Sequence, residues 1–170
     1  MILKCNVNGH DILQEIHPGE TLINFLRKNH FYGVKEGCET GDCGSCLVLV
    51  DGIPRLSCIM LAAQVNEQSI TTIEGYGTID DPHPLQKAFN KHGAIQCGYC
   101  TPAMIIAADT LLKRSSAPKE EDVRDALSGV LCRCTGYKKP VEAVMALAHN
   151  NIDCDTADDK ETPLPEISNE

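Results

Sequence analysis

The sequence predicts an α+β chain in which a strand-rich first half precedes a helical second half. In residues 1–76, short apolar or alternating runs are separated by Asn-Gly, Pro-Gly and Asp-Gly turns, a pattern typical of strands and hairpins. After residue 84 the strand pattern ends, and helix caps with a helical apolar periodicity replace it. Residues 77–84 are rich in Gly, Asp and Pro, so we expect them to link the two halves.

The first half, residues 1–76, is predicted to form a hairpin, one helix and then three further strands. Asn8-Gly9 favours a type I′ turn, and Thr21 is suited to cap the helix that follows it. A loop rich in glycine and cysteine covers residues 33–46. The predicted strands are residues 2–7, 11–17, 47–50, 53–59 and 69–73. This order of elements is typical of a β-grasp, ferredoxin-like fold.

The second half, residues 85–150, is predicted to form a small four-helix bundle. Thr101 is expected to be the N-cap of one helix, with Pro102 at its first helical position. A break at residues 115–118 separates that helix from the next. The predicted helices are residues 84–91, 101–111, 120–127 and 139–148.

Composition limits both the core and the partners. Hydrophobic residues make up 42% of the chain and aromatic residues only 4%, so the cores are expected to be small and aliphatic. The formal net charge is −9, which argues against a nucleic-acid-binding surface. Residues 153–170 contain seven acidic residues and one lysine, a net charge of −6, so most of the acidity belongs to a tail at residues 151–170. Such a segment is expected to be disordered when alone.

The N-terminal residues carry no signal-peptide pattern, and no stretch approaches the roughly 18 apolar residues of a membrane span. We therefore expect a cytoplasmic protein without a membrane partner. In that reducing setting, clustered cysteines more often hold metal or carry out redox chemistry than form disulfides. A secreted, disulfide-stapled chain is the alternative.

Ten cysteines are present, and the first group has the spacing Cys38-x4-Cys43-x2-Cys46, followed by Cys58. This C-x4-C-x2-C…C spacing is that of plant-type ferredoxins, in which the four thiolates hold a [2Fe–2S] cluster. Three thiolates must reach two irons from one loop, and the glycines of the loop permit such close wrapping. A four-cysteine zinc site is the alternative, although zinc sites favour paired knuckles on two separate arms.

The second group is Cys97-x2-Cys100 followed by Cys132-x1-Cys134. Each pair lies at a predicted helix start or helix–helix turn, where unpaired backbone N–H groups favour an anionic thiolate cluster. A zinc site and a thioredoxin-like Cys97–Cys100 redox pair are the alternatives, although the βαβ pattern of a thioredoxin is missing.

Taken together and in this order, the two motifs closely resemble the [2Fe–2S] subunit or domain of molybdenum hydroxylases of the xanthine dehydrogenase, aldehyde oxidoreductase and carbon monoxide dehydrogenase type. The likeness covers about residues 1–150 and rests on residues 33–38, 43–46, 96–102 and 131–137. This chain departs from the usual pattern at three positions. They are Ser45 where alanine is common, Ala103 where glycine is common, and Val130 where asparagine is common.

The resemblance implies an α+β chain made of a plant-type ferredoxin domain and a helical [2Fe–2S] domain, each with one cluster. The metal ligands would be Cys38, Cys43, Cys46, Cys58, Cys97, Cys100, Cys132 and Cys134. By analogy, Gln96 and Cys134 would contact the pterin of a molybdenum cofactor on a large partner subunit. The first cluster would face FAD on a medium subunit, and the chain would relay single electrons without catalytic residues of its own.

Two other functions remain open at this point: a stand-alone ferredoxin-like carrier and a zinc-stabilised interaction module. The six scattered histidines are given no catalytic role. Cys5 is expected to be a small buried hydrophobe, and Cys154 a free thiol in the tail. The tail segment at residues 163–167 carries two apolar residues on a proline-stiffened stretch, so it is expected either to stay unstructured or to lie extended on a partner subunit.

Overall fold

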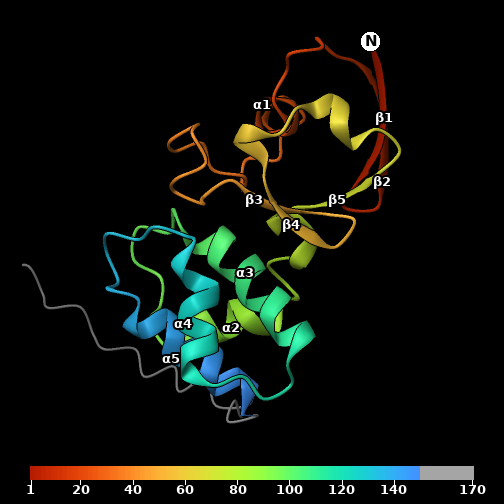
Figure 1. Ribbon diagram of the computed structural model, residues 1–170. Coiled ribbons are helices and arrows are strands. Elements are labelled where there is room, and N and C mark those ends of the chain that lie inside the picture. Colours follow the sequence, from red (N-terminus) through yellow and green to blue (C-terminus); the bar gives the residue numbers. More distant parts are fainter. Residues whose placement is uncertain (150–170) are drawn as a thin grey trace, which may run out of the picture.

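The computed structural model describes residues 1–149. Five strands form one mixed sheet, and together with the first helix they make up what we call the sheet unit; four later helices make up the helical unit (Figure 1). The strands are β1 (Ile2–Val7), β2 (His10–Glu15), β3 (Leu47–Val50), β4 (Ile53–Leu56) and β5 (Ser69–Thr71). The helices are α1 (Leu22–Lys28), α2 (Pro84–Lys91), α3 (Thr101–Arg114), α4 (Glu120–Ser128) and α5 (Lys138–Ala148). The predicted mixed α and β composition and the order of elements are confirmed.

The sheet has the strand order β2-β1-β5-β3-β4, with β1 and β5 parallel and the other neighbours antiparallel. Asn8 and Gly9 both have positive φ, as the predicted type I′ turn between β1 and β2 requires. Alternation along β1 buries Leu3, Cys5 and Val7 on one face. Cys5 is therefore the small buried residue that the sequence predicted.

Helix α1 covers the buried face of the sheet. Leu22, Ile23, Phe25 and Leu26 are all at most 2% exposed and belong to the same core as the β1 side chains. Thr21 caps the helix, since its hydroxyl accepts a hydrogen bond from the Asn24 amide at 3.4 Å.

Several predicted boundaries differ from the structure by a few residues; the strand expected over residues 11–17, for example, is β2 at His10–Glu15. The strand expected over residues 53–59 ends at Leu56, because Ser57–Ile59 forms a 3-10 turn in which the Ser57 hydroxyl donates to the Cys46 carbonyl at 2.8 Å. The strand expected over 69–73 ends at Thr71 and gives way to another 3-10 turn, Ile73–Tyr76. In α3 the N-cap is Cys100 and Thr101 is already helical, so the cap prediction was one residue late.

In the helical unit, α3 is the helix that faces the sheet, and it buries Ala103, Met104, Ile105 and Ile106 in the core that it shares with the other three helices. Asp109 of α3, which is 5% exposed, contacts residues near both ends of the linker. The Tyr76 hydroxyl donates to Asp109 at 2.8 Å, Lys113 pairs with it at 2.7 Å, and the His83 ring lies 3.9 Å from its other oxygen. Among residues 1–149, no helix is both long and apolar enough to cross a bilayer.

Candidate functional site

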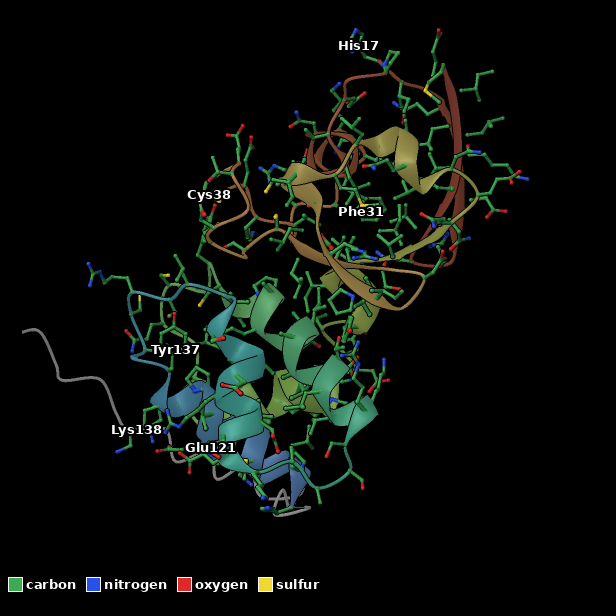
Figure 2. The ribbon with its side chains drawn as sticks, viewed as in Figure 1. His17, Phe31, Cys38, Glu121, Tyr137 and Lys138 are labelled. Atoms are coloured by element: carbon green, nitrogen blue, oxygen red, sulfur yellow. The ribbon has the colours of Figure 1, made fainter. Side chains whose placement is uncertain are left out.

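The first thiol site is assembled by a loop and a hairpin of the sheet unit. Cys38, Cys43 and Cys46 lie on the loop between α1 and β3, which projects from the side of the sheet unit in Figure 2. Cys46 directly precedes β3, and Cys58 follows β4. Because Leu47 pairs with Leu56 in the β3–β4 ladder, the hairpin brings these two cysteines together.

Backbone amides of the loop turn toward Cys38. The amides of Thr40, Asp42 and Cys43 lie 3.5, 3.2 and 3.3 Å from its sulfur. The Thr40 side chain and the amides of Cys43 and Thr40 lower the pKa of the Cys38 thiol to about 6, since they stabilise the thiolate. The loop thus already provides the donors that an anionic thiolate cluster requires.

The four sulfurs of this site interact in two pairs. The Cys43 thiol hydrogen-bonds to Cys38, and the Cys58 thiol to Cys46. Burial, followed by the contact with Cys46, raises the pKa of Cys58 to about 11. Gly37 borders the first pair closely, because a Cβ atom at that position would lie 2.8 Å from the Cys43 sulfur. A side chain at position 37 would therefore occupy space beside the thiols.

The second thiol site lies at two turns of the helical unit. Cys97 and Cys100 sit in the loop that leads into α3, and Cys132 and Cys134 in the turn between α4 and α5. Here too the sulfurs interact in pairs. The Cys134 sulfur lies 3.6 Å from that of Cys97, and the Cys100 thiol hydrogen-bonds to Cys132. Burial, together with Cys132, raises the pKa of Cys100 to about 12.

Two neighbouring residues hold the turn that carries Cys132. Thr135 places its hydroxyl 3.1 Å and its amide 3.5 Å from the Cys132 sulfur. The Tyr137 hydroxyl accepts from the Cys132 amide at 2.9 Å and donates to the Val130 carbonyl at 3.1 Å. Tyr137 has φ of +65°, so the chain reverses sharply just before α5 begins. The sequence analysis did not identify the role of Tyr137 in holding this turn.

The two thiol sites adjoin each other across the boundary between the two units. The Leu131 amide donates to the Cys43 carbonyl at 2.9 Å. The Tyr99 hydroxyl donates to the Glu36 carbonyl. Gly44 packs so closely that an added Cβ atom would lie 1.9 Å from the Gly129 carbonyl oxygen. We call this contact region the seam. Nothing in the spacing of the motifs revealed it, because its partners are 63 to 88 residues apart in the chain.

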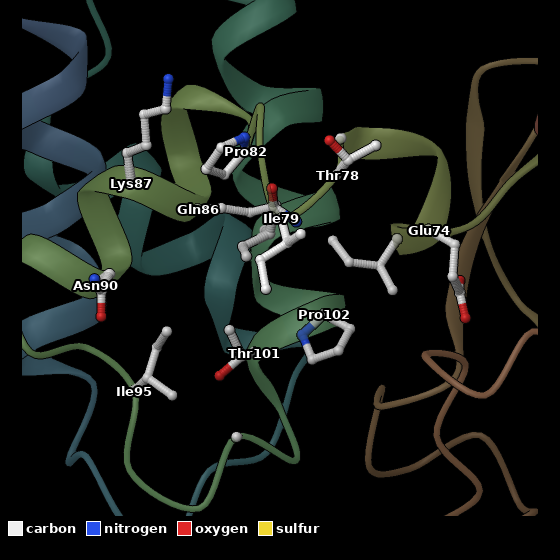
Figure 3. Close-up of a pocket in the computed structure, with 14 residues that line it drawn as sticks. Glu74, Thr78, Ile79, Pro82, Gln86, Lys87, Asn90, Ile95, Thr101 and Pro102 are labelled. Carbon is white, nitrogen blue, oxygen red and sulfur yellow. The ribbon is translucent and has the colours of Figure 1, made fainter. Parts of the chain in front are cut away.

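The residues expected to contact a pterin lie at the surface. Gln96 and Cys134 are both exposed. The sulfur of Cys97, which is also exposed, lies 3.6 Å from that of Cys134, so these residues lie at one edge of the helical unit. A surface cavity of about 680 Å³ borders this edge and lies between the linker, α2 and the start of α3 (Figure 3). Ile79 and Ile95, which line it, are 95% and 41% exposed. The edge is therefore apolar as well as thiol-bearing.

The three departures from the family pattern all lie in packed positions. Ala103 is fully buried in α3, Val130 is 2% exposed, and Ser45 is 3% exposed beside the thiol loop. None of these side chains displaces a thiol. Cys154 and the tail segment at residues 163–167 lie outside the described residues.

The donor set fits binuclear iron–sulfur clusters. In a [2Fe–2S] cluster with four cysteine ligands, each iron takes two thiolates, so two pairs per site are the arrangement required. A single zinc ion instead needs its four ligands around one point. The paired thiols are thus the arrangement that two irons at each site need.

Comparison with protein families identifies two consecutive iron–sulfur domains. The model of the 2Fe-2S iron-sulfur cluster binding domain matches residues 5–70, and that of the [2Fe-2S] binding domain matches residues 72–145. The chain is therefore an electron-transfer protein with two [2Fe–2S] clusters, which replaces the zinc interpretation.

Similar proteins narrow the class. The chain is 43% identical to the nicotinate dehydrogenase small FeS subunit of Eubacterium barkeri, over 84% of this chain and 91% of that one. Quinoline 2-oxidoreductase from Pseudomonas putida 86 has a chain that matches with a TM-score of 0.84 and 40% identity, covering 87% of this chain and 92% of that one. The aldehyde oxidoreductase from Desulfovibrio desulfuricans matches with a TM-score of 0.84 and 42% identity over 88% of this chain but only 17% of that one.

The chain belongs to the family of small iron–sulfur subunits of the molybdenum hydroxylases. Its function is that of an electron-transferring component of an oxidoreductase.

Proposed function

We propose that this chain carries single electrons between a molybdenum cofactor on a large partner subunit and FAD on a medium subunit. The observation that carries the proposal is the arrangement of eight thiols as four pairs in two adjoining sites. We assign Cys38, Cys43, Cys46 and Cys58 to one cluster, and Cys97, Cys100, Cys132 and Cys134 to the other. Each cluster, when bound, supplies a one-electron redox centre.

The pairs also assign the ligands of each iron. In the first site one iron would be held by Cys38 and Cys43 and the other by Cys46 and Cys58. In the second site the pairs would be Cys97 with Cys134, and Cys100 with Cys132. The protein's part is to hold the thiolates, direct backbone amides at them and keep the two sites in contact at the seam.

We further propose the domain organisation that the motifs indicated: a β-grasp, plant-type ferredoxin domain at residues 1–76, a linker at 77–84 and a four-helix [2Fe–2S] domain at 85–150. Two hydrophobic cores support it: one lies between the sheet and α1, and the other lies among the later helices and also takes in Leu49 and Tyr76 from the first half. On the sequence argument given above, we also propose that the protein is located in the reducing cytoplasm.

The orientation of the chain between its partners follows from the exposed edge. Cys97 and Cys134 are exposed, and Ile79, Ile95 and Leu131 around them are 95%, 41% and 57% exposed. An apolar surface of this kind is typical of a protein interface. We propose that the large subunit covers it and that Gln96 and Cys134 contact the pterin there. The aldehyde oxidoreductase from Desulfovibrio desulfuricans supports such an arrangement, because its region similar to this chain is part of a much longer polypeptide.

Elemental analysis and ligand replacement test the proposal. Purified protein should contain about four irons and four sulfides per chain, because each [2Fe–2S] site holds two of each. Cys43→Ser should remove the electron paramagnetic resonance signal of the first cluster and spare the second, and Cys132→Ser should do the reverse. Zinc without iron would refute the assignment, and loss of both signals from either change would refute independent sites.

Native mass measurement of the tagged protein from its own cells tests the partners. Association with a flavin-containing and a molybdenum-containing subunit is expected. A monomer with both clusters would instead favour a stand-alone carrier.

A further inference from the structure

Tyr99 links the two thiol sites through its side chain. It lies in the middle of the second site's loop, between Cys97 and Cys100, yet its hydroxyl donates a hydrogen bond to the Glu36 carbonyl of the first site's loop. Glu36 is two residues before Cys38. The side chain thus leaves one cysteine motif and ends on the other, 63 residues away in the chain.

The far end of the phenol lies beside a thiol of the first site. A Cβ atom on Gly37 would be 3.8 Å from the Tyr99 hydroxyl oxygen and 2.8 Å from the Cys43 sulfur, so both atoms border the same point. Cys43 is also the residue whose carbonyl accepts from the Leu131 amide at 2.9 Å. The Tyr99 and Leu131 hydrogen bonds therefore join the two turns of the second site to the loop of the first site, one at Glu36 and the other at Cys43.

The exposure of Tyr99 distinguishes this contact from ordinary core packing. The residue is 42% exposed and belongs to neither of the two hydrophobic cores. Its specific interaction is the directed hydrogen bond to a backbone carbonyl. Such a bond fixes a distance and an orientation more than it adds stability.

We propose that Tyr99 is a positioning residue for electron transfer between the two clusters: its hydroxyl holds the Cys97–Cys100 loop against the Cys38–Cys43 loop. The inference rests on the ligand assignment made above. One electron leaves one site and arrives at the other, while the phenol keeps its proton and no bond to Tyr99 forms or breaks. The rate of electron transfer falls steeply as the distance between two redox centres grows. Tyr99 therefore contributes by holding the two loops in contact.

The test uses Tyr99→Phe in the intact complex, a change that keeps the ring and removes only the hydroxyl. Losing one hydrogen bond of typical net strength should open the seam more often, so the Leu131 amide should exchange with solvent roughly 2- to 10-fold faster. The electron paramagnetic resonance signals of the two reduced clusters are split by their mutual magnetic interaction, and this splitting should become smaller in the same variant as the clusters move apart. Tyr99→Leu, which also removes the ring, should enlarge both effects.

Tyr32→Phe is the matched control. Its hydroxyl lies 3.0 Å from the His30 ring within the sheet unit, and Tyr32 is 53% exposed, so it resembles Tyr99 without reaching the seam. This change should leave both the exchange of Leu131 and the splitting unaltered.

The possible outcomes are distinct. Iron-free wild-type protein would contradict the proposed function itself. A full set of irons in wild type and in Tyr99→Phe, with unchanged Leu131 exchange and unchanged splitting, would overturn the positioning role alone. Loss of a cluster from Tyr99→Phe would also overturn it, because Tyr99 would then be required for cluster binding.

Discussion

The closest backbone approach in the seam makes Gly44→Ala an informative change. A Cβ atom on Gly44 would lie 1.9 Å from the Gly129 carbonyl oxygen and 3.0 Å from the Val130 Cα. Ordinary van der Waals contact begins at 3.4 Å, so the two loops would have to separate by about 1.5 Å. That separation acts directly on the hydrogen bond between Leu131 and Cys43.

Two costs add up at Gly44, and a second glycine separates them. Gly44 has φ of +70°, a conformation that costs an alanine about 1–2 kcal/mol. Forcing the overpacked contact apart should cost about 1–3 kcal/mol more. Gly52, in the β3–β4 turn, has φ of +76° and nothing within 4 Å of an added Cβ atom, so Gly52→Ala carries the first cost alone. The difference between the two variants isolates the clash.

The assay is amide exchange at Leu131, with the free energy of unfolding from chemical denaturation as a second measurement. A clash of about 1–3 kcal/mol should accelerate Leu131 exchange roughly 5- to 150-fold in Gly44→Ala relative to Gly52→Ala. Both variants should keep their iron, since neither glycine supplies a ligand. Equal exchange rates and equal stabilities in the two variants would show that the loops do not touch as the structure places them.

Three further changes test other parts of the chain. Asp109→Ala should lower the free energy of unfolding by about 1–3 kcal/mol, because it leaves the buried Tyr76 hydroxyl and Lys113 without their partner. Glu142→Ala, at an exposed pair with Lys139, should change the free energy of unfolding much less, and comparable losses in the two variants would contradict the linker attachment. Burial, aided by Lys113 and opposed by Asp109, lowers the pKa of His83, so the stability that the neutral ring contributes is fully present above its ordinary pKa of about 6.5 and is lost as the pH falls below that value. His83→Asn keeps an acceptor that can cap the helix, and it should weaken the dependence of the free energy of unfolding on pH below about 6.5. The same dependence on pH in the variant would show that the His83 ring is not responsible. Truncation after residue 150 should leave both clusters in place, since every assigned ligand precedes that residue. If the complex then dissociates in a native mass measurement, the tail binds a partner subunit. Loss of a cluster would contradict the proposed domain limits.

Much of the fold was predictable because local chemistry specified it. Asn8 and Gly9 adopt the positive φ values that a type I′ turn requires, and Thr21 caps α1 with its own hydroxyl. Helix α2 begins at Pro84, as expected for a residue that is favoured in the first turn of a helix. In each case the local chemistry of one or two residues favours the backbone conformation that the structure shows.

The misplaced boundaries have tertiary causes. Residues 57–59 carry a strand-like sequence, yet the Ser57 hydroxyl binds the Cys46 carbonyl and the chain turns so that Cys58 approaches Cys46. Helix α3 starts one residue earlier than predicted, because the Met104 amide donates to the Cys100 carbonyl at 3.0 Å and makes Cys100 the N-cap. At residues 57–59, the hydrogen bond to Cys46 thus ends the strand that local propensity favoured.

The cysteine spacing identified the clusters but not how they are joined, and the reason is physical. A motif such as Cys97-x2-Cys100 reports on one loop, whereas the seam depends on distances between loops that are remote in sequence. Gly44 looks like one more flexible glycine in its loop, yet the Gly129 carbonyl leaves no room for a Cβ atom there. Tyr99 looks like a spacer between two ligands, yet its hydroxyl ends on Glu36. A chain that transfers electrons must fix the distance between its two centres as firmly as it fixes each centre, and in this protein that task falls on residues between the cysteines.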